Sequence, residues 1–228
     1  MLSQILKLLT RKKTPVNLVD FNRLNPISSI FGLDRGTPID RYYIEEFLIQ
    51  NSHLIKGLVL EVGGTYYARK FGGEKMEVCE SLYVVPDPGA TLVGDLTDTL
   101  TLPQGKVDCF ICVQTLNFIF DVQKAVEGIY YLLKPGGVVL ATVSGISQIS
   151  RYDMDRWGDY WRFTSASVEK LFSRHFENAV EINSYGNVMA ATAFLTGVSL
   201  EDIPQRKMLD FHDPNYQLVI TIMARKKQ

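Results

Sequence analysis

The stretch from residue 145 to residue 164 combines aromatic and charged side chains in a pattern that suits binding of a sugar-like molecule. Five aromatic residues lie in it, including both tryptophans of the chain. A loop of this length is usually functional or disordered, and the aromatic content argues against disorder. Aromatic faces stack on the C–H faces of a polyhydroxylated ring, and charged groups bind its hydroxyls. We therefore predict a substrate loop with the binding residues Tyr152, Trp157, Tyr160 and Arg162.

The same loop also carries the candidates for a catalytic base. A hydroxyl that acts as a nucleophile must give its proton to a base within hydrogen-bond reach, and Asp155 and Asp159 are suitable carboxylates. No spacing typical of metal ligands occurs in the chain, so we expect no metal. The alternative is a structural plug, in which Phe163 and Trp161 pack over the end of the fold while Asp159 pairs with Arg162.

Strands and helices alternate along the chain and place this loop at one end of a sheet. Three apolar runs have the composition of strands buried on both faces, namely Gly57–Gly63, Val107–Val113 and Val138–Val143. Apolar periodicity predicts one helix over Val122–Leu133, with Asp121 as its cap, and another from Thr164 onward. Weaker signals predict further elements near Leu82–Val85, Thr91–Gly94, Ala179–Ile182, Val188–Thr196 and Gln217–Ala224.

The first helix of the domain is expected to begin at Pro38. Thr37 can cap it, Pro38 suits the first helical position, and Asp40 lies in the positive first turn. The alternation of strands and helices from this point onward predicts a mostly parallel sheet.

Such sheets bind ligands beyond the carboxyl ends of their strands, so the turn after Val62 is the natural ligand site. Glu61 precedes Gly63 and Gly64 at this position. A dinucleotide would need the pattern G-x-G-x-x-G, which cradles a pyrophosphate on helix N–H groups. Thr65 and two tyrosines follow the glycines instead. This disfavours an NAD-binding oxidoreductase and favours a cofactor without phosphate.

The composition suits one α/β domain, because 46% of the 228 residues are hydrophobic and can build a single core. A net charge of −1 gives no basic surface for nucleic acid. No apolar run reaches the roughly 18 residues of a membrane span, so no transmembrane segment is expected. The three cysteines form no disulfide framework, which is typical of a cytoplasmic protein. Cys109 and Cys112 would point to opposite faces of a strand and cannot chelate one metal ion.

Residues 1–30 form an N-terminal segment ahead of a domain at 31–228. Within this segment, residues 1–13 place apolar side chains on one helical face and end in a basic cluster. A secretory signal would have its charges first and a small-residue cleavage site after its apolar part. We predict a short helix that packs on the domain or on a partner, with anchoring at a membrane surface as the alternative.

Five short motifs follow one another along the chain, namely Phe31–Tyr43, Leu60–Gly63, Gly94–Leu96, Leu133–Gly137 and Asp159–Thr164. In this order and spacing they resemble the class I S-adenosylmethionine-dependent methyltransferases, in particular a type 11-like subgroup often found beside glycosyltransferases. The resemblance covers nearly the whole chain from Phe31 onward. It implies a Rossmann-like domain with a mostly parallel seven-stranded sheet, helices on both faces and an antiparallel last strand.

The resemblance also implies a site for S-adenosylmethionine. Glu61 and the two glycines after it would meet the methionine end, and Asp95 would accept from the adenine amino group. Two of these residues have structural alternatives, since Asp95 can cap the next turn and Gln114 can close a strand end. The implied cofactor residues are Glu61, Gly63, Gly64, Thr65, Asp87, Asp95, Leu96, Gln114 and Thr115, the last two near the sulfonium.

The sequence departs from the family pattern at two places. Thr65 and Tyr67 replace later glycines of the first motif, and no acidic residue ends the second strand to hold the ribose. Three explanations stay open: Asp87 reaches back, Glu80 occupies that position in a different register, or the ribose is held less tightly. A non-catalytic relative that keeps the fold is therefore an alternative.

The sequence thus predicts methyl transfer from S-adenosylmethionine to a small molecule or glycan acceptor, with a sugar or glycan hydroxyl favoured. The family's association with glycosyltransferases and the aromatic loop are the grounds for that acceptor. The alternatives are a non-catalytic methyltransferase-like binding or scaffolding domain and, less favoured, an NAD-binding oxidoreductase.

Overall fold

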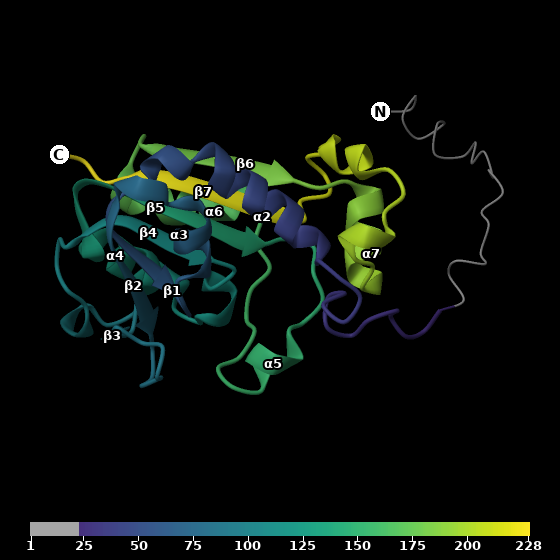
Figure 1. The fold of residues 1–228 in the computed structure, drawn as a ribbon, viewed down its shortest axis with the longest axis horizontal. Helices are drawn as coiled ribbons and strands as arrows, with labels where there is room; N and C mark the ends of the chain where they lie inside the picture. Colours follow the sequence, from purple (N-terminus) through teal and green to yellow (C-terminus); the bar gives the residue numbers. More distant parts are fainter. Residues whose placement is uncertain (1–22) are drawn as a thin grey trace, which may run out of the picture.

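Seven strands form one sheet in the computed structural model, which describes residues 23–228 (Figure 1). Their order across the sheet is β3-β2-β1-β4-β5-β7-β6. Neighbouring strands pair in parallel except at β7, which runs antiparallel to both β5 and β6. The predicted mostly parallel sheet with an antiparallel last strand is confirmed. The strands are β1 (Gly57–Val62), β2 (Met76–Tyr83), β3 (Leu92–Val93), β4 (Val107–Val113), β5 (Leu133–Ser144), β6 (Val180–Tyr185) and β7 (Val219–Arg225).

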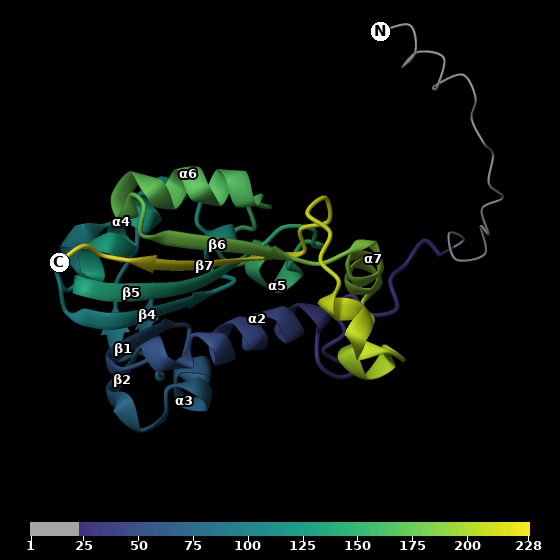
Figure 2. The same ribbon diagram turned by 90° about the horizontal axis from the view of Figure 1, so that it is seen from above.

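Helices cover both faces of the sheet, with α4 and α6 on one face and α2 and α3 on the other (Figure 2). Each face has its own buried cluster. Cys112 packs in the cluster under α4 and α6, whereas Cys109 packs in the cluster under α2, so the two thiols point to opposite faces as predicted. The helices are α2 (Ile39–Gln50), α3 (Tyr66–Phe71), α4 (Val122–Leu132), α5 (Arg151–Met154), α6 (Ser165–Phe176) and α7 (Val188–Thr196).

Side-chain caps determine where four of these helices begin, with Ser150 at the beginning of α5. Asp121 accepts a hydrogen bond from the third residue of α4, as predicted. Thr164 and Ser167 form a reciprocal capping box at α6, and Asn187 caps α7. The beginning of α6 fixes the end of the loop that follows β5.

The beginning of α2 is held by the C-terminal part of the chain instead of by a cap. The prediction that Thr37 caps this helix is wrong, because its N–H and its hydroxyl both donate to Glu201, at 2.7 and 2.9 Å. Pro38 stands just before the first helical residue. Arg35 also forms a bidentate ion pair with Asp202, at 2.9 Å.

β2 lies earlier in the chain than the prediction near Leu82–Val85. It runs over Met76–Tyr83. Most of its residues are polar or only partly buried, so the sequence shows no continuous apolar run there. Glu80 pairs with Leu60 in the middle of the strand. It therefore does not occupy the end of β2, and Asp87 is the acidic residue that follows this strand.

The loop between β5 and α6 contains one helical turn, α5, which Ser150 caps by accepting from the N–H of Asp153. The rest of the loop has no helix or strand, as predicted. Among residues 23–228, no helix is long and apolar enough to cross a membrane. The predicted helix at residues 1–13 lies outside the described residues.

Candidate functional site

Two adjoining cavities open at the carboxyl ends of the parallel strands. The larger has a volume of about 890 Å³ and extends from Val62, at the end of β1, to Tyr160 in the loop after β5. The smaller has a volume of about 230 Å³ and lies between α2 and that loop. A molecule in one cavity therefore lies next to a molecule in the other. The walls of the two cavities share Val113, Gln114, Phe118 and Asp153.

The turn after β1 presents bare backbone to the larger cavity. Gly63 lines this cavity and has a φ of +74°, a left-handed conformation that favours glycine. A Cβ atom at Gly63 or Gly64 would meet no other atom within 4 Å, so the space in front of both residues is open. Gly64 and Thr65 stand beside the cavity and are not part of its lining.

Glu61 is buried behind this turn. Its carboxylate accepts hydrogen bonds from the backbone N–H groups of Tyr67, at 3.1 Å, and Ala68, at 2.8 Å. Burial raises the pKa of the Glu61 carboxyl, and these two hydrogen bonds offset part of that effect. In this structure the carboxylate stabilises the first turn of α3, where the helix dipole favours negative charge.

Two aspartates that follow β2 and β3 line the larger cavity. Asp95 accepts from the N–H and the hydroxyl of Thr97 at 2.7 and 2.8 Å, in both cases through Oδ1. Asp87 accepts from the N–H of Gly89 at 2.8 Å, again through Oδ1. In the described residues no hydrogen bond uses Oδ2 of either aspartate, so a local turn role and a ligand role are compatible. The buried Leu96 completes this part of the wall.

Gln114 lies at the boundary of the two cavities, directly after β4. Its φ of +50° is uncommon for a residue with a side chain, and such conformations cluster at functional sites. Its N–H donates to the carbonyl oxygen of Thr142 at 2.9 Å, and its side-chain oxygen accepts from the Ser144 hydroxyl at 2.5 Å. The strand-end role is therefore present, and the side chain also lies in both walls. Thr115 lines the larger cavity beside it.

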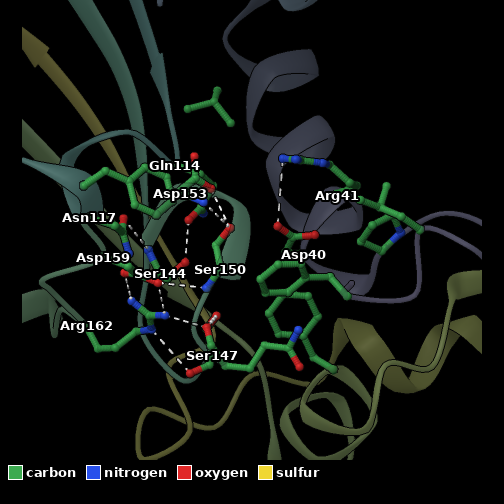
Figure 3. A pocket seen from close by; sticks show the side chains of 17 residues that line it. Asp40, Arg41, Gln114, Asn117, Ser144, Ser147, Ser150, Asp153, Asp159 and Arg162 are labelled. Atoms are coloured by element: carbon green, nitrogen blue, oxygen red, sulfur yellow. Dashed lines mark hydrogen bonds and ion pairs between the residues drawn. The ribbon is translucent and has the colours of Figure 1, made fainter. Parts of the chain in front are cut away.

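Polar side chains line the smaller cavity from two directions (Figure 3). Asp40 and Arg41 come from the first turn of α2. Asn117, Asp159 and Arg162 lie on the opposite side, with the serines of β5 and of the loop after it. The other polar residues of the lining are Gln114, Ser144, Ser147, Gln148, Ser150 and Asp153.

Asp159 is held in a buried ion pair. Arg162 donates to both of its carboxylate oxygens, and the N–H of Ser150 donates to one of them at 2.9 Å. The side chain of Asp159 is 1% exposed. Burial alone would raise the pKa of this carboxyl, but the hydrogen bonds from Arg162 and Ser150 lower it below its ordinary value. A carboxylate stabilised in this way is a weak proton acceptor, and the geometry is that of the structural alternative.

Asp155 lies outside both cavities and pairs with Arg151 at 3.1 Å on the exposed side of α5. Asp153, which the sequence analysis did not single out, lies in the shared wall. Its carboxylate accepts from the Ser150 hydroxyl at 2.5 Å and from the indole N–H of Trp157 at 3.0 Å. A helical turn so short has no apolar periodicity that would show which of its aspartates faces the site.

The aromatic residues of the loop divide between the cavity wall and the core. Tyr152, Trp157 and Tyr160 line the larger cavity and are partly exposed. Phe163 is 6% exposed and packs in the core, as the plug interpretation predicts. Trp161 is 36% exposed and lies outside that core, but its ring stacks on Phe120 and its indole N–H donates to the carbonyl oxygens of Ile119 and Phe120, at 3.0 and 3.2 Å. Arg162, the fourth predicted substrate residue, lines the smaller cavity.

The two cysteines of β4 take no part in this site. Burial raises the pKa of both thiols, Cys109 and Cys112, to about 12, so neither forms a thiolate at neutral pH. Within residues 23–228, no group of three histidine, cysteine or acidic side chains is arranged to hold a metal ion.

Comparison with known proteins shows which protein family and which solved folds this chain resembles. Residues 55–141, from just before β1 into β5, match the family model described as "Methyltransferase domain". A search of curated proteins found no match to the chain.

Solved structures with similar folds include several methyltransferases. A S-adenosylmethionine-dependent methyltransferase of Thermotoga maritima, described as a possible histamine N-methyltransferase, is 18% identical with a TM-score of 0.53, covering 83% of this chain and 92% of that one. The N-methyltransferase NodS of Bradyrhizobium japonicum WM9, solved with S-adenosyl-L-homocysteine, is 12% identical with a TM-score of 0.51, covering 85% and 90%. The [4+2]-cyclase SpnF is 16% identical with a TM-score of 0.54, covering 89% of each chain.

The chain therefore has the fold of the class I S-adenosylmethionine-dependent methyltransferases. The match of residues 55–141 to the methyltransferase model supports S-adenosylmethionine as the cofactor and methyl transfer as the chemistry.

Proposed function

We propose that this protein transfers a methyl group from S-adenosylmethionine to a small polar acceptor, with the cofactor in the larger cavity and the acceptor in the smaller one. The observation that carries this proposal is the shared wall at Gln114 and Asp153. Two cavities that meet at one wall can hold two molecules with their reacting atoms adjacent, and positioning supplies much of the catalysis of an in-line displacement.

The larger cavity has the features that the cofactor needs. The open space in front of Gly63 suits the methionine end, and Leu96 offers an apolar face to the adenine. The Oδ2 atoms of Asp95 and Asp87 supply acceptors for the adenine amino group and the ribose hydroxyls. When bound, S-adenosylmethionine supplies a methyl group made electrophilic by its positive sulfur.

The acceptor belongs in the smaller cavity because its lining is polar and because it adjoins Gln114. We propose a sugar or glycan hydroxyl as the acceptor group, since many side chains that line the cavity are of types that form hydrogen bonds with hydroxyls. This choice also agrees with the resemblance to methyltransferases found beside glycosyltransferases. The three free cysteines fit action in a reducing compartment such as the cytoplasm.

Calorimetry with S-adenosylhomocysteine and with NAD tests the cofactor assignment. We expect saturable binding of S-adenosylhomocysteine and no binding of NAD. Binding of NAD in its place would favour an oxidoreductase. A lack of binding of either ligand at millimolar concentration would favour the scaffolding alternative.

A second candidate function is a non-catalytic or non-transferring role on the same fold. Thr65 and Tyr67 stand where the methyltransferase pattern has further glycines, and Glu61 is engaged by α3. The similar fold of a cyclase fits the principle that one fold hosts unrelated reactions. Binding of S-adenosylhomocysteine without any methyl transfer from labelled S-adenosylmethionine to glycan acceptors would favour this candidate.

A further inference from the structure

Asp40 and Arg41 form a charged pair on the α2 side of the smaller cavity. Figure 3 shows both side chains on the helix, across the cavity from Asp153 and Asp159. Both residues line the cavity, and the Asp40 side chain is 14% exposed. The first turn of α2 therefore brings one carboxylate and one guanidinium to the same side of the candidate acceptor site.

This pair does not satisfy its own hydrogen-bonding capacity. The nearest charged atoms, Oδ2 of Asp40 and Nη1 of Arg41, are 3.9 Å apart, which is beyond hydrogen-bond length. Oδ1 of Asp40 and Nη1 of Arg41 are buried and have no hydrogen-bond partner among the described residues. Buried charged groups left without partners cost free energy, and such cases in folded proteins point to strain or to a missing ligand.

The other charged groups around the cavity are already paired. Arg162 and Asp159 satisfy each other, and both oxygens of Asp153 accept hydrogen bonds, from Ser150 and Trp157. Tyr67 on α3 and Glu45 on α2 also act electrostatically on Arg41. The unmet capacity of this wall therefore belongs to Asp40 and Arg41.

We propose that Asp40 and Arg41 together bind one hydroxyl group of the acceptor, which donates to Asp40 and accepts from Arg41. A hydroxyl is a donor and an acceptor at once, as this pair requires. An ammonium group cannot accept from a guanidinium and is repelled by it, and a carboxylate cannot donate to Asp40 and is repelled by it. The pair thus selects a neutral hydroxyl over both kinds of ion. Rotation of the Asp40 carboxylate about its last bond, a soft torsion, can turn either oxygen toward the cavity.

This inference rests on the proposed methyl transfer, and it gives Asp40 a step in it. The acceptor oxygen forms a bond to the methyl carbon while the carbon–sulfur bond breaks, and the electron pair of that bond stays on sulfur. The hydroxyl proton passes to the Asp40 carboxylate. Burial raises the pKa of Asp40, and the Arg41 guanidinium offsets only part of that effect, so this carboxylate is a stronger base than an exposed one.

Three probes that share one ring and differ in one group test the selection. The full chain, ¹⁵N-labelled and saturated with S-adenosylhomocysteine, is titrated with cyclohexanol, cyclohexylammonium and cyclohexanecarboxylate at pH 7.5. The amide resonances of the first turn of α2 report binding. We expect cyclohexanol to shift them saturably, with a Kd at least about tenfold lower than that of either ion. Asp40→Asn and Arg41→Gln should each remove that preference, whereas Asp155→Asn, on the exposed side of α5, should keep it.

Equal or tighter binding of the ammonium or carboxylate probe would overturn the proposal. So would the absence of a saturable α2 shift with cyclohexanol up to its solubility limit, or a preference that persists in both variants. Binding of S-adenosylhomocysteine is measured in the same samples. If the wild type does not bind S-adenosylhomocysteine, the result counts against the proposed function. If it binds S-adenosylhomocysteine but does not prefer the hydroxyl probe, the result counts against this inference alone.

Discussion

The indole N–H of Trp157 donates to the carboxylate of Asp153, four residues earlier, at 3.0 Å. This bond ties an aromatic side chain of the larger cavity to an aspartate that lines both cavities. The loop after β5 therefore contributes to both sides of the site through one pair of residues, and its shape sets the position of the shared wall.

Trp157→Ala should weaken both ligand binding and stability only moderately. Trp157 is 43% exposed, so we expect a loss of no more than about 1.5 kcal/mol in the free energy of unfolding, mainly from one hydrogen bond. Affinity for S-adenosylhomocysteine should fall by roughly tenfold or less, since one aromatic contact contributes about 0.5–1.5 kcal/mol. Phe163→Ala is the matched core variant and should lose roughly 3–5 kcal/mol. Urea denaturation that shows a similar loss for both variants would assign Trp157 to a structural plug.

Asp159→Asn should destabilise the protein, because it leaves Arg162 and the Ser150 N–H without a carboxylate. Breaking a buried pair costs roughly 3–5 kcal/mol, and we expect somewhat less here because Arg162 is partly exposed. Asp155→Asn removes an exposed ion pair with Arg151 and should lower the free energy of unfolding by about 0.5 kcal/mol or less. Because the pKa of Asp159 is lowered by folding, its contribution is present above the unfolded pKa and is lost as the pH falls through the folded one. Urea denaturation of the two variants at pH 7 and at acidic pH measures both effects, and equal losses would contradict the burial of this pair.

Asp95→Ala should weaken binding of S-adenosylhomocysteine by roughly 1.5–3 kcal/mol, the usual range for a hydrogen bond to a charged group. Asp98→Ala is the matched control. Asp98 also accepts a backbone hydrogen bond two residues ahead, at 3.0 Å, but it lies outside the cavity. Calorimetry that shows the same change in both variants would reduce the role of Asp95 to that of a turn residue.

The carboxyl of Asp40 should titrate above its ordinary value of 3.8, because burial disfavours its charge. Arg41→Gln should raise this pKa further, since the charge of the guanidinium is the largest of the effects that offset burial, ahead of two backbone hydrogen bonds. A carboxyl with a raised folded pKa contributes stability that is present below the unfolded pKa and is lost as the pH rises through the folded one. Asp40→Asn should therefore not lower the free energy of unfolding at pH 7. Carboxyl ¹³C NMR titration and urea denaturation check both expectations, and a wild-type pKa at or below 3.8 would contradict them.

The sheet was predictable from sequence because its central strands carry a strong signal. β1, β4 and most of β5 are apolar runs buried on both faces, and Asp121 and Thr164 mark the starts of α4 and α6. β2 was misplaced because it lies toward the edge of the sheet, where outward residues such as Glu77 and Val78 are exposed and break the apolar pattern.

The site was predictable in the aromatic loop after β5, where Tyr152, Trp157, Tyr160 and Arg162 line the two cavities, and where residues follow a strand. Gly63, Asp95 and Gln114 lie in the cavity wall for that reason. Asp40 carries a local signal for a helix start, and nothing near it in the sequence shows that α2 begins beside the loop after β5. That juxtaposition depends on contacts between distant segments, which periodicity and spacing do not encode.

The hydrogen bonds of Thr37 to Glu201 join residues 164 positions apart, and they hold the start of the helix that carries Asp40. The larger cavity uses only residues 62 to 160. The smaller cavity therefore depends on a segment that the wall of the larger cavity does not include. The two halves of the site rest on different parts of the chain, and a change at residue 201 should act on the α2 side of the site first.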